Sequence, residues 1–106
     1  MLNRKPIFAA IFILMLTTGA VQAGDDPAAG AALAVECAMC HGEDGKGNDV
    51  IPALTGLDGA YLIEQLKAFK SGERVDENEM MRMYTEDLSD QDMTDLVAYY
   101  LSLSAD

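Results

Sequence analysis

The chain has 106 residues, of which 18 are Asp or Glu and 7 are Lys or Arg, and its formal net charge at pH 7 is −11. A chain this short forms one small domain, whose core needs support from a disulfide, a metal or a bound group. The negative charge argues against nucleic acid and anionic lipid as partners, because both would be repelled. It favours basic protein partners, although a negative exterior that only maintains solubility explains the charge equally well.

Residues 1–23 have the order of features of a secretory signal peptide. Two basic residues precede an apolar run over 7–16, and small and polar residues follow up to Ala23. An uncleaved membrane anchor is the alternative, but the run ends well before the roughly 18 apolar residues that a span requires. We therefore expect export to the bacterial periplasm, removal of 1–23, and no stable membrane insertion of the remaining domain, residues 24–106.

The first helix of this domain is predicted over 27–39. Asp26 supplies a side-chain acceptor for the free amides at the helix start, and Pro27 occupies a position where its missing N–H costs little. Residues 42–59 follow with five glycines and Pro52, so they are predicted to form an irregular loop.

A second helix is predicted over 60–72, because apolar residues recur there at helical spacing and Gly72 is placed to end it. The acidic, methionine-rich segment 73–87 has only a possible helical turn around 79–84.

The last helix is predicted to open at Ser89, where Asp92 completes an approximate capping box. Five residues form its apolar face: Met93, Leu96, Val97, Tyr100 and Leu101. No segment shows the alternation of a strand, so the predicted fold class is all-α.

Cys37, Cys40 and His41 form a Cys-x-x-Cys-His motif that contains both cysteines and the single histidine of the chain. In an exported protein this motif is the signature of covalent haem attachment, in which each thiol adds to a haem vinyl group and the imidazole coordinates iron. Cysteines three positions apart lie on one face of a helical turn, so both can reach the ring. We therefore expect one haem c, attached through Cys37 and Cys40, which would also supplement the small core.

Three other interpretations of the motif are weaker. A redox dithiol of the thioredoxin type requires a βαβ framework, and no strand is predicted. A structural zinc site needs four ligands, and the chain has no second cluster of Cys or His. A plain disulfide would leave the adjacent histidine unexplained.

A haem that only transfers electrons needs a second axial ligand, which closes the sixth position of the iron. No other histidine is available, so a methionine after the motif is expected to serve. Met93 falls on the apolar face of the last helix and is expected in the core. Three candidates remain in the acidic segment: Met80, Met81 and Met83.

Residues 26–104 resemble a class I c-type cytochrome, nearest to the small bacterial cytochromes of the c4 and c553 kinds. Besides the motif, the resemblance rests on Gly30, the glycine-rich loop 42–47, the stretch 52–56, the helix up to Gly72, the Leu-Ser-Asp sequence 88–90, and the Tyr99-Tyr100 pair. It implies a small cytochrome c fold, with helices and loops wrapped around one covalently bound haem. The c4 proteins usually contain two such units, whereas this chain has one.

The resemblance also implies roles for single residues. In that family the axial methionine lies seven positions before the leucine of Leu-Ser-Asp, which selects Met81, with Met83 second and Met80 third. The proline after the glycine-rich loop accepts a hydrogen bond from the proximal imidazole through its carbonyl, which implies that Pro52 orients His41.

Two further positions follow from the same resemblance. Gly30 would allow the first and last helices to cross closely against Tyr99 or Tyr100. Arg74 is a candidate partner for a haem propionate, although a solvated surface arginine is the simpler interpretation.

The function expected from these residues is that of a periplasmic electron carrier, not an enzyme, with haem iron held by His41 and Met81. Its partners would be redox proteins, with basic docking surfaces if the acidity serves docking. The alternative is a cytochrome subunit of a periplasmic oxidoreductase, resembling that of a flavin-dependent sulfide dehydrogenase. A gas-sensing or peroxidatic cytochrome is a third possibility, and it would need an open iron.

Overall fold

The computed structural model describes residues 26–104, and the expected signal peptide, 1–23, lies outside the described residues. The described part contains helices and loops and no strand, so the predicted all-α class is confirmed. None of its helices is long and apolar enough to cross a bilayer. The elements in chain order are α1 (Pro27–His41), α2 (Gly59–Ser71), the 3-10 helix η1 (Glu77–Glu79), α3 (Met80–Thr85) and α4 (Asp90–Ser104).

Helix α1 starts where the sequence predicts. One carboxylate oxygen of Asp26 accepts hydrogen bonds from the amides of Ala28 and Ala29, each at 3.1 Å. The helix runs two residues beyond the predicted end and stops at Gly42, whose φ of 88° few other residues adopt. The Cys-x-x-Cys-His motif therefore occupies the last turns of α1.

Side chains and a glycine mark the ends of α2 and α4, and all but Asp58 were predicted. The Asp58 carboxylate accepts from the Tyr61 amide at 3.2 Å at the start of α2, and Gly72 ends that helix in the left-handed conformation. At the start of α4 the Ser89 hydroxyl accepts from the Asp92 amide, while the Asp92 carboxylate accepts from the Ser89 amide, both at 3.0 Å. The capping box is thus confirmed.

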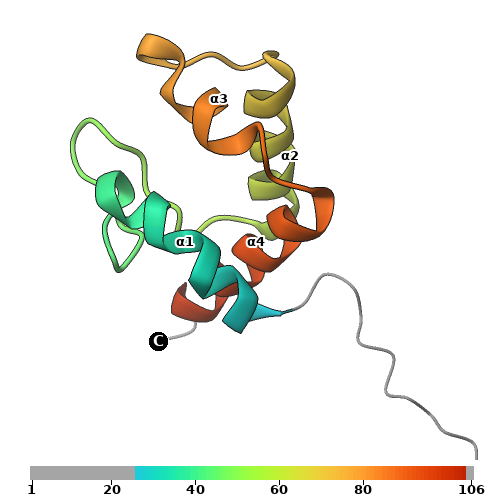
Figure 1. The fold of residues 1–106 in the computed structure, drawn as a ribbon. Helices are drawn as coiled ribbons and strands as arrows, with labels where there is room; N and C mark the ends of the chain where they lie inside the picture. Colours follow the sequence, from blue (N-terminus) through green and yellow to red (C-terminus); the bar gives the residue numbers. More distant parts are fainter. Residues whose placement is uncertain (1–25, 105–106) are drawn as a thin grey trace, which may run out of the picture.

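Helix α1 crosses α4, whereas α2 packs against both α3 and α4 (Figure 1). The crossing is close at Gly30, where a Cβ atom would lie 1.9 Å from the Asp95 carbonyl oxygen and 2.9 Å from the Tyr99 Cβ. This confirms the close approach expected of Gly30. Beside it, Ala34, Leu96 and Tyr100 form a buried cluster; Met93 is also fully buried, as predicted.

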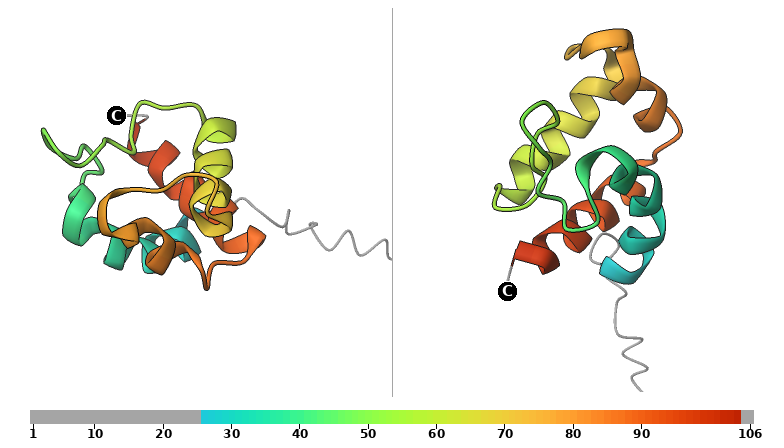
Figure 2. Two further views of the ribbon diagram at one scale, coloured as in Figure 1. Left: turned by 90° about the horizontal axis from the view of Figure 1, so that it is seen from above. Right: turned by 90° about the vertical axis from the view of Figure 1, so that its left-hand side faces the viewer.

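The irregular loop between α1 and α2 folds back on the end of α1 (Figure 2). The Gly47 amide donates to the His41 carbonyl at 2.7 Å, and the Leu54 amide donates to the Gly45 carbonyl at 2.7 Å. Gly47 has a φ of 63°, and a Cβ atom there would be 2.2 Å from the Ile51 carbonyl oxygen. The glycine therefore permits the close return of the chain that brings Pro52 towards His41.

Candidate functional site

The motif presents its three side chains differently. The Cys37 thiol is half-buried, the Cys40 thiol is exposed, and neither is in a disulfide. His41 is buried. Within residues 26–104, no group of three or more His, Cys, Asp or Glu side chains is arranged to hold a metal ion.

His41 is oriented by one short hydrogen bond. Its Nδ1 lies 2.7 Å from the carbonyl oxygen of Pro52. Because a carbonyl oxygen can only accept, Nδ1 carries the proton and Nε2 keeps its lone pair free to bind a metal. Asn48 supports the turn before Pro52, since its side-chain oxygen accepts from the amides of Val50 and Ile51 at 2.8 and 2.9 Å. Sequence reasoning missed Asn48, although asparagine is a common turn residue of this kind.

Tyr100 and Cys37 are neighbours in the core between α1 and α4. Burial raises the pKa of the Cys37 thiol, an effect that the Tyr100 hydroxyl opposes and the Glu36 carboxylate reinforces. Burial and the adjacent thiol raise the pKa of Tyr100 well above its usual range. The Tyr100 side chain is only 5% exposed, and among the described residues its hydroxyl makes no hydrogen bond of ordinary geometry, although the Cys37 thiol is close enough to affect its pKa.

The four methionines after the motif differ in environment. Met80 is 40% exposed and Met83 is 60% exposed, whereas Met81 is half-buried and Met93 is fully buried. The main chain of Met81 is also fixed by neighbouring side chains. Its amide donates to the Asp76 carboxylate, and its carbonyl accepts from the Thr85 hydroxyl.

A cavity of about 580 Å³ lies between α1, α3 and the start of α4. Its size is in the range of ligand and cofactor pockets. Cys37 and Met83 line the cavity, but His41 and Met81 do not. The cavity therefore includes only one edge of the predicted haem site. Its other lining residues are Ala32, Leu33, Val35, Glu36, Tyr84, Asp87, Leu88, Asp92 and Leu96.

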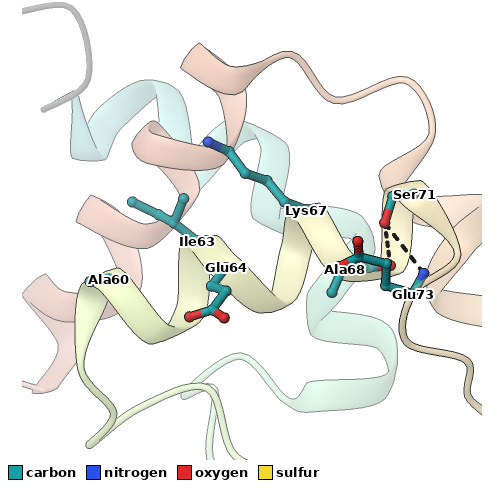
Figure 3. Close-up of a pocket in the computed structure, with 7 residues that line it drawn as sticks. All are labelled: Ala60, Ile63, Glu64, Lys67, Ala68, Ser71 and Glu73. Atoms are coloured by element: carbon teal, nitrogen blue, oxygen red, sulfur yellow. Dashed lines mark hydrogen bonds between the residues drawn. The ribbon is translucent and has the colours of Figure 1, made fainter.

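A second depression, of about 450 Å³, lies along α2 and contains none of the motif residues (Figure 3). Glu64, Lys67 and Glu73 provide its charged groups. Ser71 bridges its end, donating to the Ala68 carbonyl at 3.1 Å and accepting from the Glu73 amide at 3.3 Å. Its lining contains no Cys, His, Met or Tyr, the residue types that hold haem, so it is not the candidate haem site.

Arg74 is exposed, and its side chain contacts two residues of α2. Its guanidinium donates to the Gln65 side chain at 2.7 Å and lies over the Phe69 ring, 4.6 Å from the centroid. These contacts favour the surface interpretation of Arg74 over a role in binding a propionate.

The family model of cytochrome c matches residues 27–104, and the chain therefore belongs to the cytochrome c family. It is 37% identical to cytochrome c4 of Pseudomonas aeruginosa over 97 residues, a match that covers 91% of this chain and 47% of that protein. It is 40% identical to cytochrome c-554(548) of Halomonas halodenitrificans, with coverage of 73% of this chain and 95% of that protein. The resemblance to the c4 kind is confirmed, and the chain spans about half the length of its c4 relatives.

Solved structures show the same fold. A cytochrome c4 of Acidithiobacillus ferrooxidans superposes with a TM-score of 0.66 at 31% identity, covering 74% of this chain and 49% of that chain. A thiosulfate dehydrogenase of Marichromatium purpuratum gives a TM-score of 0.66 at 34% identity, covering 71% of this chain and 19% of that chain.

A cytochrome c domain implies haem c, and the residues present fit that group. Two unpaired thiols and a histidine with a free Nε2 occupy consecutive turns at the end of α1. The buried, unpartnered hydroxyl of Tyr100 is next to Cys37, where a thioether bond would form. Because buried hydroxyls normally have a partner, this hydroxyl is consistent with a further group at that position.

Proposed function

We propose that this chain is a periplasmic single-haem electron carrier, with haem c attached through Cys37 and Cys40 and its iron held by His41 and Met81. The observation that carries the proposal is the 2.7 Å contact from His41 Nδ1 to the Pro52 carbonyl. It fixes the tautomer in which Nε2 is the metal-binding nitrogen, and it holds the ring in one orientation. A histidine that served only to pack the core would not need its second nitrogen free.

When bound, the haem supplies a one-electron Fe(II)/Fe(III) couple, which methionine ligation shifts to a more positive potential than histidine ligation at both positions. The role of the chain is to keep the ligands in place while the charge changes. Pro52 holds the imidazole of His41, and Met81 would be the second side chain to hold the iron. This arrangement suits electron transfer and does not provide an open position for catalysis.

We propose the cavity between α1 and α3 as the place where partners approach the haem. It adjoins Cys37, and the exposed apolar side chains of Val35 and Met83 stand at it. Glu36 and Asp87 add exposed carboxylates, and no Lys or Arg of residues 26–104 lines the cavity. A redox protein with a basic docking surface complements this face, through an interface of less than roughly 1,200 Å² typical of short-lived electron-transfer complexes.

The proposed location rests on the sequence of residues 1–23, which we take as a signal peptide that is removed on export. Residues 24–106 would then be the mature cytochrome domain.

A cytochrome subunit of an oxidoreductase is the second candidate. A relative named as a thiosulfate dehydrogenase electron acceptor, from Stutzerimonas stutzeri, is 39% identical over 79 residues. In such a complex the same haem ligands would serve, but the surface at Val35 and Met83 would hold a catalytic partner permanently.

Expression in a host that attaches haem c tests both candidates. The carrier predicts a mass increased by one haem and a reduced absorption spectrum typical of six-coordinate haem c. On gel filtration at moderate salt, elution as a small single chain supports the carrier, and copurification with a flavoprotein or another redox enzyme supports the subunit. The bare apoprotein mass would reject both, and rapid carbon monoxide binding to the reduced protein would indicate an open iron.

A further inference from the structure

We propose that Asp76 and Thr85 are positioning residues, which hold the main chain of Met81 so that its sulfur stays on the iron. The inference rests on the proposed role of Met81 as the axial ligand. It concerns how the protein resists replacement of that ligand by other molecules.

Asp76 caps the helix that carries Met81. Its two carboxylate oxygens lie 3.1 and 3.3 Å from the Met81 amide nitrogen. Its carbonyl accepts from the Glu79 amide at 3.0 Å, which closes the turn in front of α3. The residue directly before α3, Glu79, makes no capping bond with its own side chain. Asp76 therefore provides the cap from five positions before Met81.

The turn that Asp76 closes is strained. Asn78 and Glu79 are consecutive non-glycine residues with φ values of 64° and 54°. The left-handed conformation is unfavourable for both, and more so for glutamate than for asparagine. Such a backbone persists only where surrounding contacts enforce it. The bonds made by Asp76 span this turn and so contribute to enforcing it.

Thr85 holds the carbonyl group of Met81, as Asp76 holds its amide. It is 1% exposed, and its hydroxyl donates to the Met81 carbonyl at 2.8 Å. Met81 thus has side-chain hydrogen bonds at both its amide and its carbonyl. In the described part of the chain, no side-chain hydrogen bond reaches the main chain of Met80 or Met83.

The two hydrogen bonds to the Met81 main chain matter because a thioether is a neutral, weak ligand of iron, which external ligands can displace. For an external ligand to bind, the Met81 side chain would have to move away from the iron. This movement costs more free energy when the Met81 main chain is held in place. Loss of a hydrogen bond to a charged group should therefore appear as easier ligand replacement.

Imidazole titration of the ferric holoprotein measures this effect directly. Asp76→Ala should bind imidazole about tenfold more tightly than the wild type, because a charge-assisted hydrogen bond is lost. Asp76→Asn keeps an acceptor oxygen and should recover most of the difference. Glu77→Gln, a matched loss of one negative charge in the same segment, should behave as the wild type. An equal effect of Glu77→Gln would overturn the inference in favour of a general charge effect.

Thr85 is tested with Thr85→Val, which removes the hydroxyl at nearly constant volume, and Thr85→Ser, which retains it. Tighter imidazole binding in the valine variant only would support the inference. If the valine variant does not fold, a serine variant with wild-type affinity and Asp76→Ala with increased affinity still support it. Wild-type affinity in Asp76→Ala would overturn it.

The background variant Met81→Leu separates this inference from the proposed ligand. With Met81 absent, Asp76→Ala should give no further change in imidazole affinity, since Asp76 acts through Met81. A persistent effect would overturn the positioning role while leaving the haem function intact. Retention of the ferric methionine charge-transfer band in Met81→Leu would overturn the ligand assignment, and the inference with it.

Discussion

Gly30 of α1 lies directly against the main chain of Asp95 in α4, so close that a Cβ atom on the glycine would be 1.9 Å from the Asp95 carbonyl oxygen. The Asp95 side chain ties the same crossing together. Its buried carboxylate accepts from the Gln91 side chain at 2.8 Å and from the Asp26 amide at 3.3 Å. The start of α1, the helix that carries the Cys-x-x-Cys-His motif, is therefore fixed to the last helix by both steric fit and hydrogen bonding.

Replacing Gly30 with alanine should destabilise the holoprotein by about 3 kcal/mol, because α1 and α4 must move apart to accept the methyl group. Urea unfolding followed by circular dichroism measures the change. Gly59→Ala is the control, because its Cβ would meet side chains and no backbone, with Leu101 at 3.0 Å and Val97 at 3.4 Å. It should change stability by less than about 1 kcal/mol. Equal losses in the two variants would contradict the role given to the crossing.

The axial ligand can be identified by paired methionine variants. Met81→Ala should lose the weak charge-transfer band of ferric methionine ligation and lower the reduction potential markedly, because the sulfur donor is removed. Met83→Ala is the control, and its 60% exposed side chain should be replaceable with neither change. Visible spectra and potentiometric titration provide both readouts. The opposite pattern would assign the ligand to Met83.

Electron transfer to a positively charged partner should depend on carboxylates at the α1–α3 cavity. The wild-type rate should fall as salt rises, because exposed charges are screened over roughly 10 Å at 0.1 M. The double variant Glu36→Gln, Asp87→Asn should be slower at low salt by about threefold to tenfold and should approach the wild type at high salt. Stopped-flow kinetics across a salt series measures both.

The matched control removes two charges elsewhere, with Glu64→Gln and Glu73→Gln at the depression on α2 (Figure 3). This variant should retain the wild-type rate. If both pairs slow the reaction equally, net charge and not the cavity governs the encounter. Electron-transfer rates that do not change with salt would indicate that the negative charge of the protein serves solubility and not docking.

Tyr100 predicts a pH dependence of stability in the alkaline range. Its pKa is raised in the folded protein, so below about pH 10 it is neutral in both states and has no effect. Above that pH the unfolded chain releases the proton while the folded chain retains it. The free energy of unfolding should therefore fall by up to about 1.4 kcal/mol per pH unit.

Tyr100→Phe should remove this component, which urea titrations between about pH 9 and 11 would reveal as a shallower decline. The more exposed Tyr61 provides the control, and Tyr61→Phe should decline as steeply as the wild type. Parallel declines in wild type and Tyr100→Phe would show that the Tyr100 hydroxyl is not responsible.

The features of the fold that could be predicted from the sequence depend on interactions between residues close together in the chain. Helix ends could be placed because Asp26, Gly72 and the Ser89–Asp92 box act on amides or backbone angles within a few residues. The burial of Met93 followed from its position on a periodic apolar face.

Other features depend on contacts that no local pattern encodes. The bond between Asp76 and Met81 crosses a turn formed by Asn78 and Glu79, and although asparagine adopts left-handed backbone more readily than most residues, glutamate does not, so the sequence does not predict the pair. The cavity brings Glu36 together with residues some fifty positions later, which only the packed helices can do. The preference for Met81 came from its position in the family pattern, because the residues alone left three methionines open.

The crossing of α1 and α4 also constrains the order in which the protein can be assembled. Cys37 and Cys40 lie on the first helix, yet the surface against which that helix packs is the last one made. Until α4 is made, Cys37 lacks Leu96 and Tyr100, the buried side chains of that helix against which it packs. The long sequence separation of this contact therefore makes closure of the fold around Cys37 a late event.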